Sequence, residues 1–359
     1  MQMHQQLTKT LARPLLVIGL TWTGIGETLA EADSARTITT ARCGSVIDGI
    51  SDQILGSQTL GIQSGRIVSI TETPPEMAID LDLSDYTCLP GLVNTHVHLD
   101  ANPEDAADYG VYARRTQADN LELILKNAST TVRTGFTTVR HAGAWFPDTL
   151  AMAKAKIDGG HAIGPRIQSA GPYLTIPGGG GYLTFPEIPT NKIPTESQQG
   201  IASTPEEFAE RAKKAIDNGA DFLKVIASGA VFSTGTEPRA PEMHQDDIEA
   251  VVAVAKKRGV KVTAHVHSDQ SGQDAILAGV NSLEHASLLS DETIALAVEN
   301  DVALSMDVYF AGVVNYVIST PPVSEGEPVA MISKVAERQQ QVASLPIRFC
   351  SYRRNSNIN

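Results

Sequence analysis

The chain has 359 residues, 42% of them hydrophobic and 19% charged, which is the composition of a globular protein with a sizeable core. This length predicts one large domain with a smaller appendage. The formal net charge of −13 argues against binding to nucleic acid or anionic membranes, because both surfaces would repel the chain.

Residues 1–32 have the three-part pattern of a secretory signal peptide. Lys9 and Arg13 supply positive charge, Leu15 to Gly26 form an apolar stretch too short to span a bilayer, and Ala30-Glu31-Ala32 is a small-x-small cleavage site. The pattern predicts a periplasmic or secreted protein with no membrane attachment after cleavage. A buried or disordered N-terminal segment is the alternative interpretation.

The next segment, to about residue 84, contains short apolar stretches separated by turn sequences. Asp48-Gly49 and Ser64-Gly65 indicate tight turns between strands, so hairpins are predicted here. The chain has an odd number of cysteines, and they lie far apart: Cys43, Cys88 and Cys350. This spacing predicts neither a disulfide framework nor a zinc finger.

A short apolar segment then ends in two histidines. The run Leu89-Pro90-Gly91-Leu92-Val93-Asn94-Thr95 leads into His96-Val97-His98. Side chains alternate along a strand, so His96 and His98 point the same way and form half of a metal site. Such a pair alone is a weak signal, and its weight comes from the residues that follow.

Three further candidate ligands, Lys224, His265 and His285, each end an apolar, β-branched stretch. Predicted helices at 204–218, 245–258 and 272–277 separate or follow these stretches. Strands that alternate with helices indicate βα units and a parallel sheet. Functional residues at the carboxyl ends of parallel strands point to a (β/α)8 TIM-type barrel.

Seven barrel strands are predicted within a barrel domain at 85–341. They are 88–96, 136–141, 166–170, 222–226, 260–265, 282–285 and 303–307. A helix from Pro328 to Gln341 would precede the eighth strand, but residues 342–359 lose the pattern. The barrel therefore looks truncated before strand 8. The tail is interpreted as the product of a frameshift or truncation, with a divergent native tail as the alternative.

The order HxH, Lys, His, His on successive strands resembles the amidohydrolase superfamily. Leu-Pro-Gly-Leu-Val-Asn-Thr-His-Val-His matches its first barrel strand, and the segments 137–140, 164–167, 222–229 and 282–286 are similar to the imidazolonepropionase-like and Xaa-Pro dipeptidase-like branch. The resemblance implies that residues 33–84 are part of a small β-sandwich.

The resemblance also implies a metal site and its chemistry. His96 and His98 would hold one divalent ion, and His265 and His285 a second. Lys224 would bridge them as a carbamate. Zinc is the favoured metal, with manganese and iron as alternatives. The family has a strand-8 aspartate that serves both as ligand and as proton shuttle, whereas this sequence has no aspartate after Asp307.

The sequence also supports predictions for three further residues, His141, His267 and Glu284. His141 ends the second strand and is predicted to contact substrate, with a satisfied loop histidine as the alternative. His267 lies on the same face as His265 and is predicted to support the site or contact substrate. With Lys224, these two complete the predicted catalytic set. Glu284 alternates away from His285 and is predicted to be structural.

The predicted function is metal-dependent hydrolysis of C–N bonds in a small-molecule or dipeptide substrate, such as Xaa-Pro or N-acyl amino acids, through activated hydroxide. The alternative is a truncated chain that is inactive or only binds ligands. A lactonase or phosphotriesterase would use the same chemistry. A homo-oligomer is compatible with the sequence, which does not determine the oligomeric state.

Overall fold

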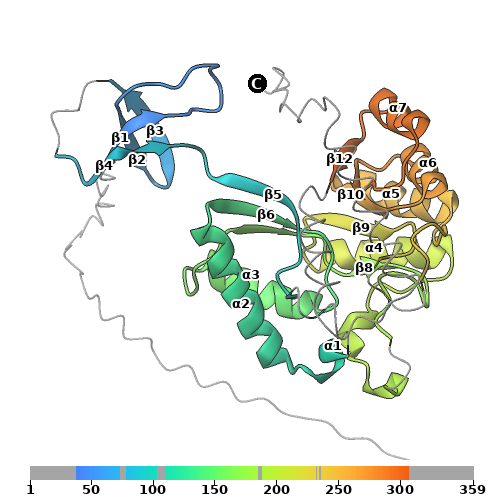
Figure 1. The fold of residues 1–359 in the computed structure, drawn as a ribbon. Helices are drawn as coiled ribbons and strands as arrows, with labels where there is room; N and C mark the ends of the chain where they lie inside the picture. The colour runs from blue at the N-terminus through green and yellow to red at the C-terminus, as the bar shows by residue number, and fades with distance from the viewer. Residues whose placement is uncertain are drawn as a thin grey trace, which may run out of the picture. The chain divides into compact units, whose positions relative to one another are not determined.

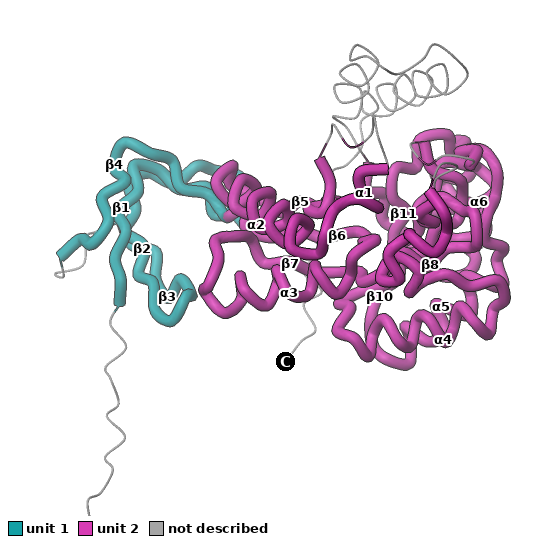
Figure 2. Tube along the Cα trace, turned by 90° about the horizontal axis from the view of Figure 1, so that it is seen from below, with its two compact units in different colours: residues 1–90 teal, residues 91–359 magenta. Residues whose placement is uncertain are grey.

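The computed structural model describes residues 38–306 except 73–77, 103–104, 106–109, 185–187, 232 and 234–235. The predicted signal peptide, Asp307, the helix at 328–341 and the tail at 342–359 lie outside the described residues. The chain divides into two compact units, residues 1–90 and 91–359 (Figure 2).

The first unit contains one four-stranded sheet in the order β3-β2-β1-β4. Its strands are β1 (Thr39–Val46), β2 (Gln58–Gln63), β3 (Arg66–Thr71) and β4 (Leu81–Cys88). The β2–β3 pair is antiparallel, and its turn residues Ser64 and Gly65 have positive φ values of 52° and 73°. This is the predicted hairpin, since left-handed residues match the twist of paired strands. The described residues form a single sheet and not two facing sheets.

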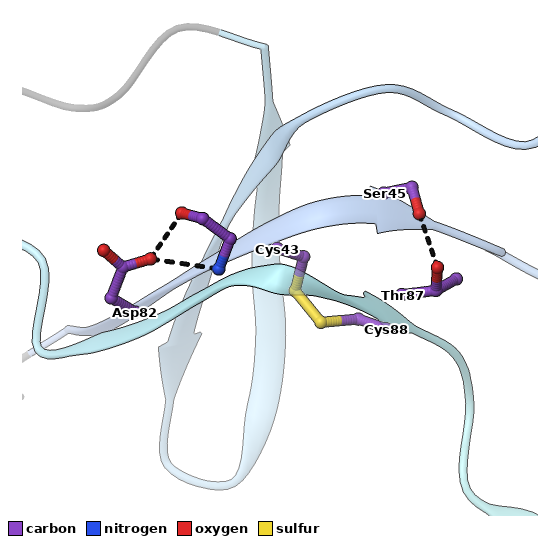
Figure 3. Close-up of a disulfide and its surroundings, with 6 residues drawn as sticks. Cys43, Ser45, Asp82, Thr87 and Cys88 are labelled. Atoms are coloured by element: carbon purple, nitrogen blue, oxygen red, sulfur yellow. Dashed lines mark hydrogen bonds between the residues drawn. A yellow bond between two sulfur atoms is a disulfide. The ribbon is translucent and has the colours of Figure 1, made fainter.

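A disulfide joins Cys43 in β1 to Cys88 at the end of β4 (Figure 3). The sequence predicted no disulfide framework, and it gave no sign of this single pairing. The two residues are 45 positions apart, but β1 and β4 are parallel neighbours in the sheet. This strand pairing brings their Cα atoms to 5.9 Å, and the spacing in the sequence contains no sign of it.

The second unit alternates strands and helices (Figure 1). The strands are β5 (Leu92–Val97), β6 (Phe136–His141), β7 (Arg166–Ser169), β8 (Tyr173–Leu174), β9 (Phe222–Ile226), β10 (Lys261–Val266), β11 (Ser282–His285) and β12 (Ala303–Ser305). The helices are α1 (Val111–Arg114), α2 (Gln117–Arg133), α3 (Pro147–Asp158), α4 (Pro205–Asp217), α5 (Gln245–Arg258), α6 (Asp269–Ala278) and α7 (Asp291–Glu299). Two short 3-10 turns, Thr190–Lys192 and Thr195–Gln198, precede α4.

All strand pairs of this unit are parallel, in sheets ordered β5-β6-β7 and β12-β11-β10-β9-β8. Segment 166–174 links them, because β7 pairs with β6 and β8 pairs with β9. Between β7 and β8, Gly171 has a φ of 69°, which bends the chain. The described residues form no closed barrel: β5 and β12 end the two sheets, although Thr95 Oγ1 lies 2.9 Å from Ser305 Oγ.

The core of this unit lies between the sheets and the helices that cover them. All five residues of β9 are buried, which accounts for its continuous apolar sequence. Phe208 of α4 and Ile248 of α5 belong to the same buried cluster as Leu223 of β9. Thr204 caps α4, and a left-handed Gly259 ends α5. No helix among residues 38–306, as far as they are described, is long and apolar enough to cross a membrane.

Candidate functional site

Histidines from different strands gather at the carboxyl ends of the parallel strands. His96 lies next to the last residue of β5, and its ring centroid lies 4.7 Å from that of His285 of β11. His285 lies 4.5 Å from His265 of β10 in the same measure, and His98 lies 5.0 Å from His96. The structure therefore brings together the four histidines that the sequence indicated as ligands.

The hydrogen bonds of His96 and His98 determine which nitrogen of each ring carries the proton. Nδ1 of His96 lies 2.8 Å from a carboxylate oxygen of Glu284, and Nδ1 of His98 lies 3.1 Å from the carbonyl oxygen of Gly143. Carboxylate and carbonyl oxygens accept hydrogen bonds, so both Nδ1 atoms carry protons. The two Nε2 lone pairs then face each other at 3.1 Å. Two such lone pairs repel each other unless a cation lies between them, so this pair fits a metal ion.

His265 contributes a lone pair on its other nitrogen. Its Nε2 donates to the carbonyl oxygen of Gly229 at 3.2 Å, which leaves Nδ1 as the acceptor atom of the ring. The ring of His267 lies 4.7 Å from that of His265 and stacks on His285 at 5.1 Å. The buried His267 also has its Nδ1 3.1 Å from Ser287 Oγ. It therefore contacts both imidazoles of the second predicted ligand pair.

Lys224 occupies the middle of β9 with only 1% of its surface exposed. In its ammonium form it would act electrostatically on His96, His98, His265 and Glu284. A buried ammonium is costly, and this cost favours a neutral amine or a modified lysine. The predicted bridging residue thus lies within electrostatic reach of both histidine pairs.

Three of the histidines, His96, His98 and His265, have lowered pKa values that keep them neutral at pH 7. Burial and the charge of Lys224 lower the pKa of His96 to about 4, although the hydrogen bond to Glu284 opposes this shift. Burial, followed by the charges of neighbouring histidines, holds the pKa of His98 and of His265 well below the usual range. Neutral imidazole is the form that binds metals.

His141 lies at the end of β6 and is fully buried. Its Nε2 accepts a hydrogen bond from the backbone N–H of Leu99 at 3.0 Å and lies 3.3 Å from Asp100 Oδ1. Ligand atoms of His98, Asp100 and His141 all lie within 4.8 Å of one another, so these three residues could also hold a metal ion. The sequence analysis missed Asp100, although it follows His98 by two positions and therefore extends the HxH pattern.

Glu284 does not point away from the site, so that prediction was wrong. The side chain is completely buried, and besides His96 it accepts a hydrogen bond from Thr263 and lies 3.5 Å from Arg140. The alternation rule fails because His285 has a φ of 67°, a left-handed conformation that ends the strand geometry there. Both Glu284 and His285 can therefore face the same cluster.

Two opposing effects act on the pKa of Glu284. Burial raises it, but the hydrogen bond from His96 and the charges of Lys224, His96 and Arg140 bring it well below the usual range. The carboxyl group is thus a buried anion next to the imidazoles. It balances part of the positive charge that Lys224 or a metal ion brings to this position.

Tyr173 of β8 is a further residue that the sequence analysis missed. Its hydroxyl oxygen lies 3.0 Å from His98 Nδ1, and its ring lies 5.7 Å from that of Trp145. Gly143 packs directly against the Tyr173 ring, where an added Cβ would come within 2.4 Å of the ring carbons. Because β8 is only two residues long, no periodic pattern marks it in the sequence.

In a comparison with known protein families, residues 87–320 match the sequence model of the Amidohydrolase family. The ochratoxinase of Aspergillus niger is 26% identical over 227 residues, which are 60% of this chain and 46% of that protein. An uncharacterized protein of Mycobacterium tuberculosis is 28% identical over 247 residues, which are 68% of this chain and 56% of that protein. The matches thus span about half the length of these curated relatives.

Solved structures agree with this match. A Xaa-Pro dipeptidase with methionine bound in its active site is 26% identical, with a TM-score of 0.74, over 86% of this chain and 75% of that one. A prolidase complexed with N-methylphosphonate-L-proline is 25% identical, with a TM-score of 0.75, over 85% of this chain and 74% of that one. Both support an α/β fold of the TIM-barrel type.

Proposed function

Because the chain belongs to the amidohydrolase family, we propose that it is a metal-dependent hydrolase of C–N bonds in amides or dipeptides. One observation carries the proposal: the Nε2 lone pairs of His96 and His98 converge at 3.1 Å, while each Nδ1 is held by an acceptor oxygen. The names of the relatives, Xaa-Pro dipeptidase, prolidase and ochratoxinase, favour a substrate with an amide or peptide bond.

The donor set suits two divalent ions. His96 and His98 would hold one ion, and His265 and His285 the other. Nitrogen ligands with a carboxylate-like bridge favour zinc. Such ions lower the pKa of water and polarise a substrate carbonyl.

We assign the bridge to Lys224. Its neutral amine would attack CO2, forming an N–C bond and releasing a proton, so that the side chain becomes a carbamate. Burial in β9 favours the neutral amine that this step needs. The product carries a negative charge and two oxygen ligands, in place of a positive charge that would repel metal ions.

His141 and His267 would have separate roles: His141 would contact the substrate, and His267 would support the second pair of histidines. Nδ1 of His141 has no hydrogen-bond partner among the described residues, and a substrate carbonyl or carboxylate would supply one once it displaces the groups that now bury this atom. His267 is packed against His265 and His285 and keeps these two rings in place.

We also propose that the protein is periplasmic or secreted. The signal-like pattern at residues 1–32 supports export. The Cys43–Cys88 disulfide supports it independently, because disulfides persist in oxidising compartments and are rare in reducing ones.

A direct test measures hydrolysis of Xaa-Pro dipeptides and N-acyl amino acids by the zinc-loaded protein. We expect turnover that a chelator abolishes and that added zinc restores. Variant His96→Asn should lose turnover and zinc together. Zinc binding without hydrolysis of any C–N, ester or phosphoester substrate would favour the binding-only alternative, and ester or phosphoester hydrolysis alone would redirect the substrate class.

A further inference from the structure

We propose that Glu284 is a positioning residue that fixes the tautomer and orientation of His96 for metal binding. The inference deepens the proposed function and rests on it for the identity of the bound group. The tautomer itself is a property of the metal-free chain and can be measured without any metal.

Glu284 is held from several strands at once. Its Oε2 accepts from Nδ1 of His96 on β5 at 2.8 Å, and its Oε1 lies 3.5 Å from the guanidinium of Arg140 on β6. The hydroxyl of Thr263 on β10 donates to Oε1, and Ser282 Oγ lies 3.4 Å from the same oxygen. Three other strands and β11 itself, which carries Ser282, therefore contribute partners to one carboxylate, whose side chain is 0% exposed.

This network leaves the carboxylate little freedom. The two oxygens have different partners: Oε1 faces the hydroxyls and Arg140, and Oε2 faces His96. Arg140 is itself held by the ring of Phe222, 4.5 Å from its guanidinium carbon. A carboxylate fixed in this way presents an acceptor to His96, so the proton of that ring must reside on Nδ1.

The consequence for His96 is that Nε2 keeps its lone pair and points toward Nε2 of His98. Without the carboxylate, the ring could flip or carry its proton on Nε2, and either change would remove a metal ligand. Residues that orient ligating histidines in this manner usually change metal affinity by about 10–100-fold when they are replaced. A merely structural Glu284 would stabilise the fold without changing the tautomer of His96.

The test uses Glu284→Gln, which keeps the size of the side chain but replaces one acceptor oxygen with a donor group. The matched control is Glu196→Gln. Glu196 is a partly buried glutamate that accepts from Thr149 N at the start of α3 and has no contact with a histidine in the described residues.

The first readout is the ring-nitrogen NMR spectrum of His96 in the metal-free, histidine-labelled full-length protein, assigned by comparison with His96→Asn. We expect the Nδ1–H tautomer in the unaltered protein and in Glu196→Gln, and a shift toward Nε2–H in Glu284→Gln. An unchanged tautomer in Glu284→Gln would overturn the proposal, whatever the metal content of the protein.

The second readout is the dissociation constant for Zn²⁺, measured against a chromogenic chelator. We expect binding about 10–100-fold weaker in Glu284→Gln than in Glu196→Gln. Equal affinities in these two variants would contradict the proposal. If the unaltered protein itself took up no zinc, the proposed function would fail, while the NMR result would still decide the role of Glu284.

Discussion

Replacing both Cys43 and Cys88 with alanine removes the covalent link between β1 and β4. The sheet of the first unit has few other sources of stability. Every residue of β3 is exposed, and the buried hydrophobic residues of this sheet are Ala41, Cys43 and Val46. We therefore expect the sheet of the double variant to open far more often than that of the unaltered protein.

The size of the effect follows from the loop that the disulfide closes. For a separation of 45 residues, the chain-entropy relation gives a loss of roughly 13 cal/mol/K in the unfolded chain, or about 4 kcal/mol at 25 °C. Because 1.4 kcal/mol corresponds to a factor of ten, amide exchange that requires opening of this sheet should accelerate by about three orders of magnitude.

Hydrogen exchange of the full-length protein measures this directly, with the amides of β1 and β4 as reporters. Cys350→Ala is the matched control, because it removes a cysteine and leaves the Cys43–Cys88 pair intact. The control should exchange like the unaltered protein. Equal exchange of β1 and β4 in the double variant and in the control would refute the argument that the disulfide holds this sheet.

Three further predictions concern the second unit. Lys224→Gln should reduce turnover by at least about 100-fold, because a glutamine cannot form the carbamate that bridges two ions; initial rates at saturating zinc measure this loss. Tyr173→Phe should weaken zinc binding less than about fivefold in a chelator competition, because the carbonyl of Gly143 still accepts from His98 Nδ1. Burial raises the pKa of Glu242 from 4.5 to about 7, so the folded form holds this proton more tightly than the unfolded form. The free energy of unfolding should therefore fall as the pH rises from about 4.5 to about 7. Urea titrations at pH 5 and pH 8 should show a fall that is smaller by about 1–2 kcal/mol in Glu242→Gln than in the unaltered protein.

Several strands of the second unit could be predicted from the sequence because short strand-like segments alternate with helical patterns. The predicted segments 136–141, 222–226 and 282–285 coincide with β6, β9 and β11. The helix at 245–258 coincides with α5, whose C-terminal end carries the glycine expected at a helix end. The predicted truncation before strand 8 stays a prediction, because residues 307–359 fall outside the described residues.

The contacts that orient the side chains of the site could not be predicted from the sequence. Glu284 was predicted to point away because strand alternation was assumed to continue through His285, which adopts a left-handed conformation. The partners of Glu284 on β5, β6 and β10 lie far from it in the sequence, so nothing local identifies them. The partnership of Cys43 and Cys88 depends in the same way on the parallel pairing of β1 and β4.

The central claim is that His96, His98, Lys224, His265 and His285 form a metal site. The most direct test is the metal content per chain after loading the full-length protein with zinc in bicarbonate buffer and removing free ions. We expect two zinc ions per chain in the unaltered protein and fewer than two in His96→Asn and in His265→Asn. A zinc-free unaltered protein, or variants that still hold two zinc ions per chain, would contradict it.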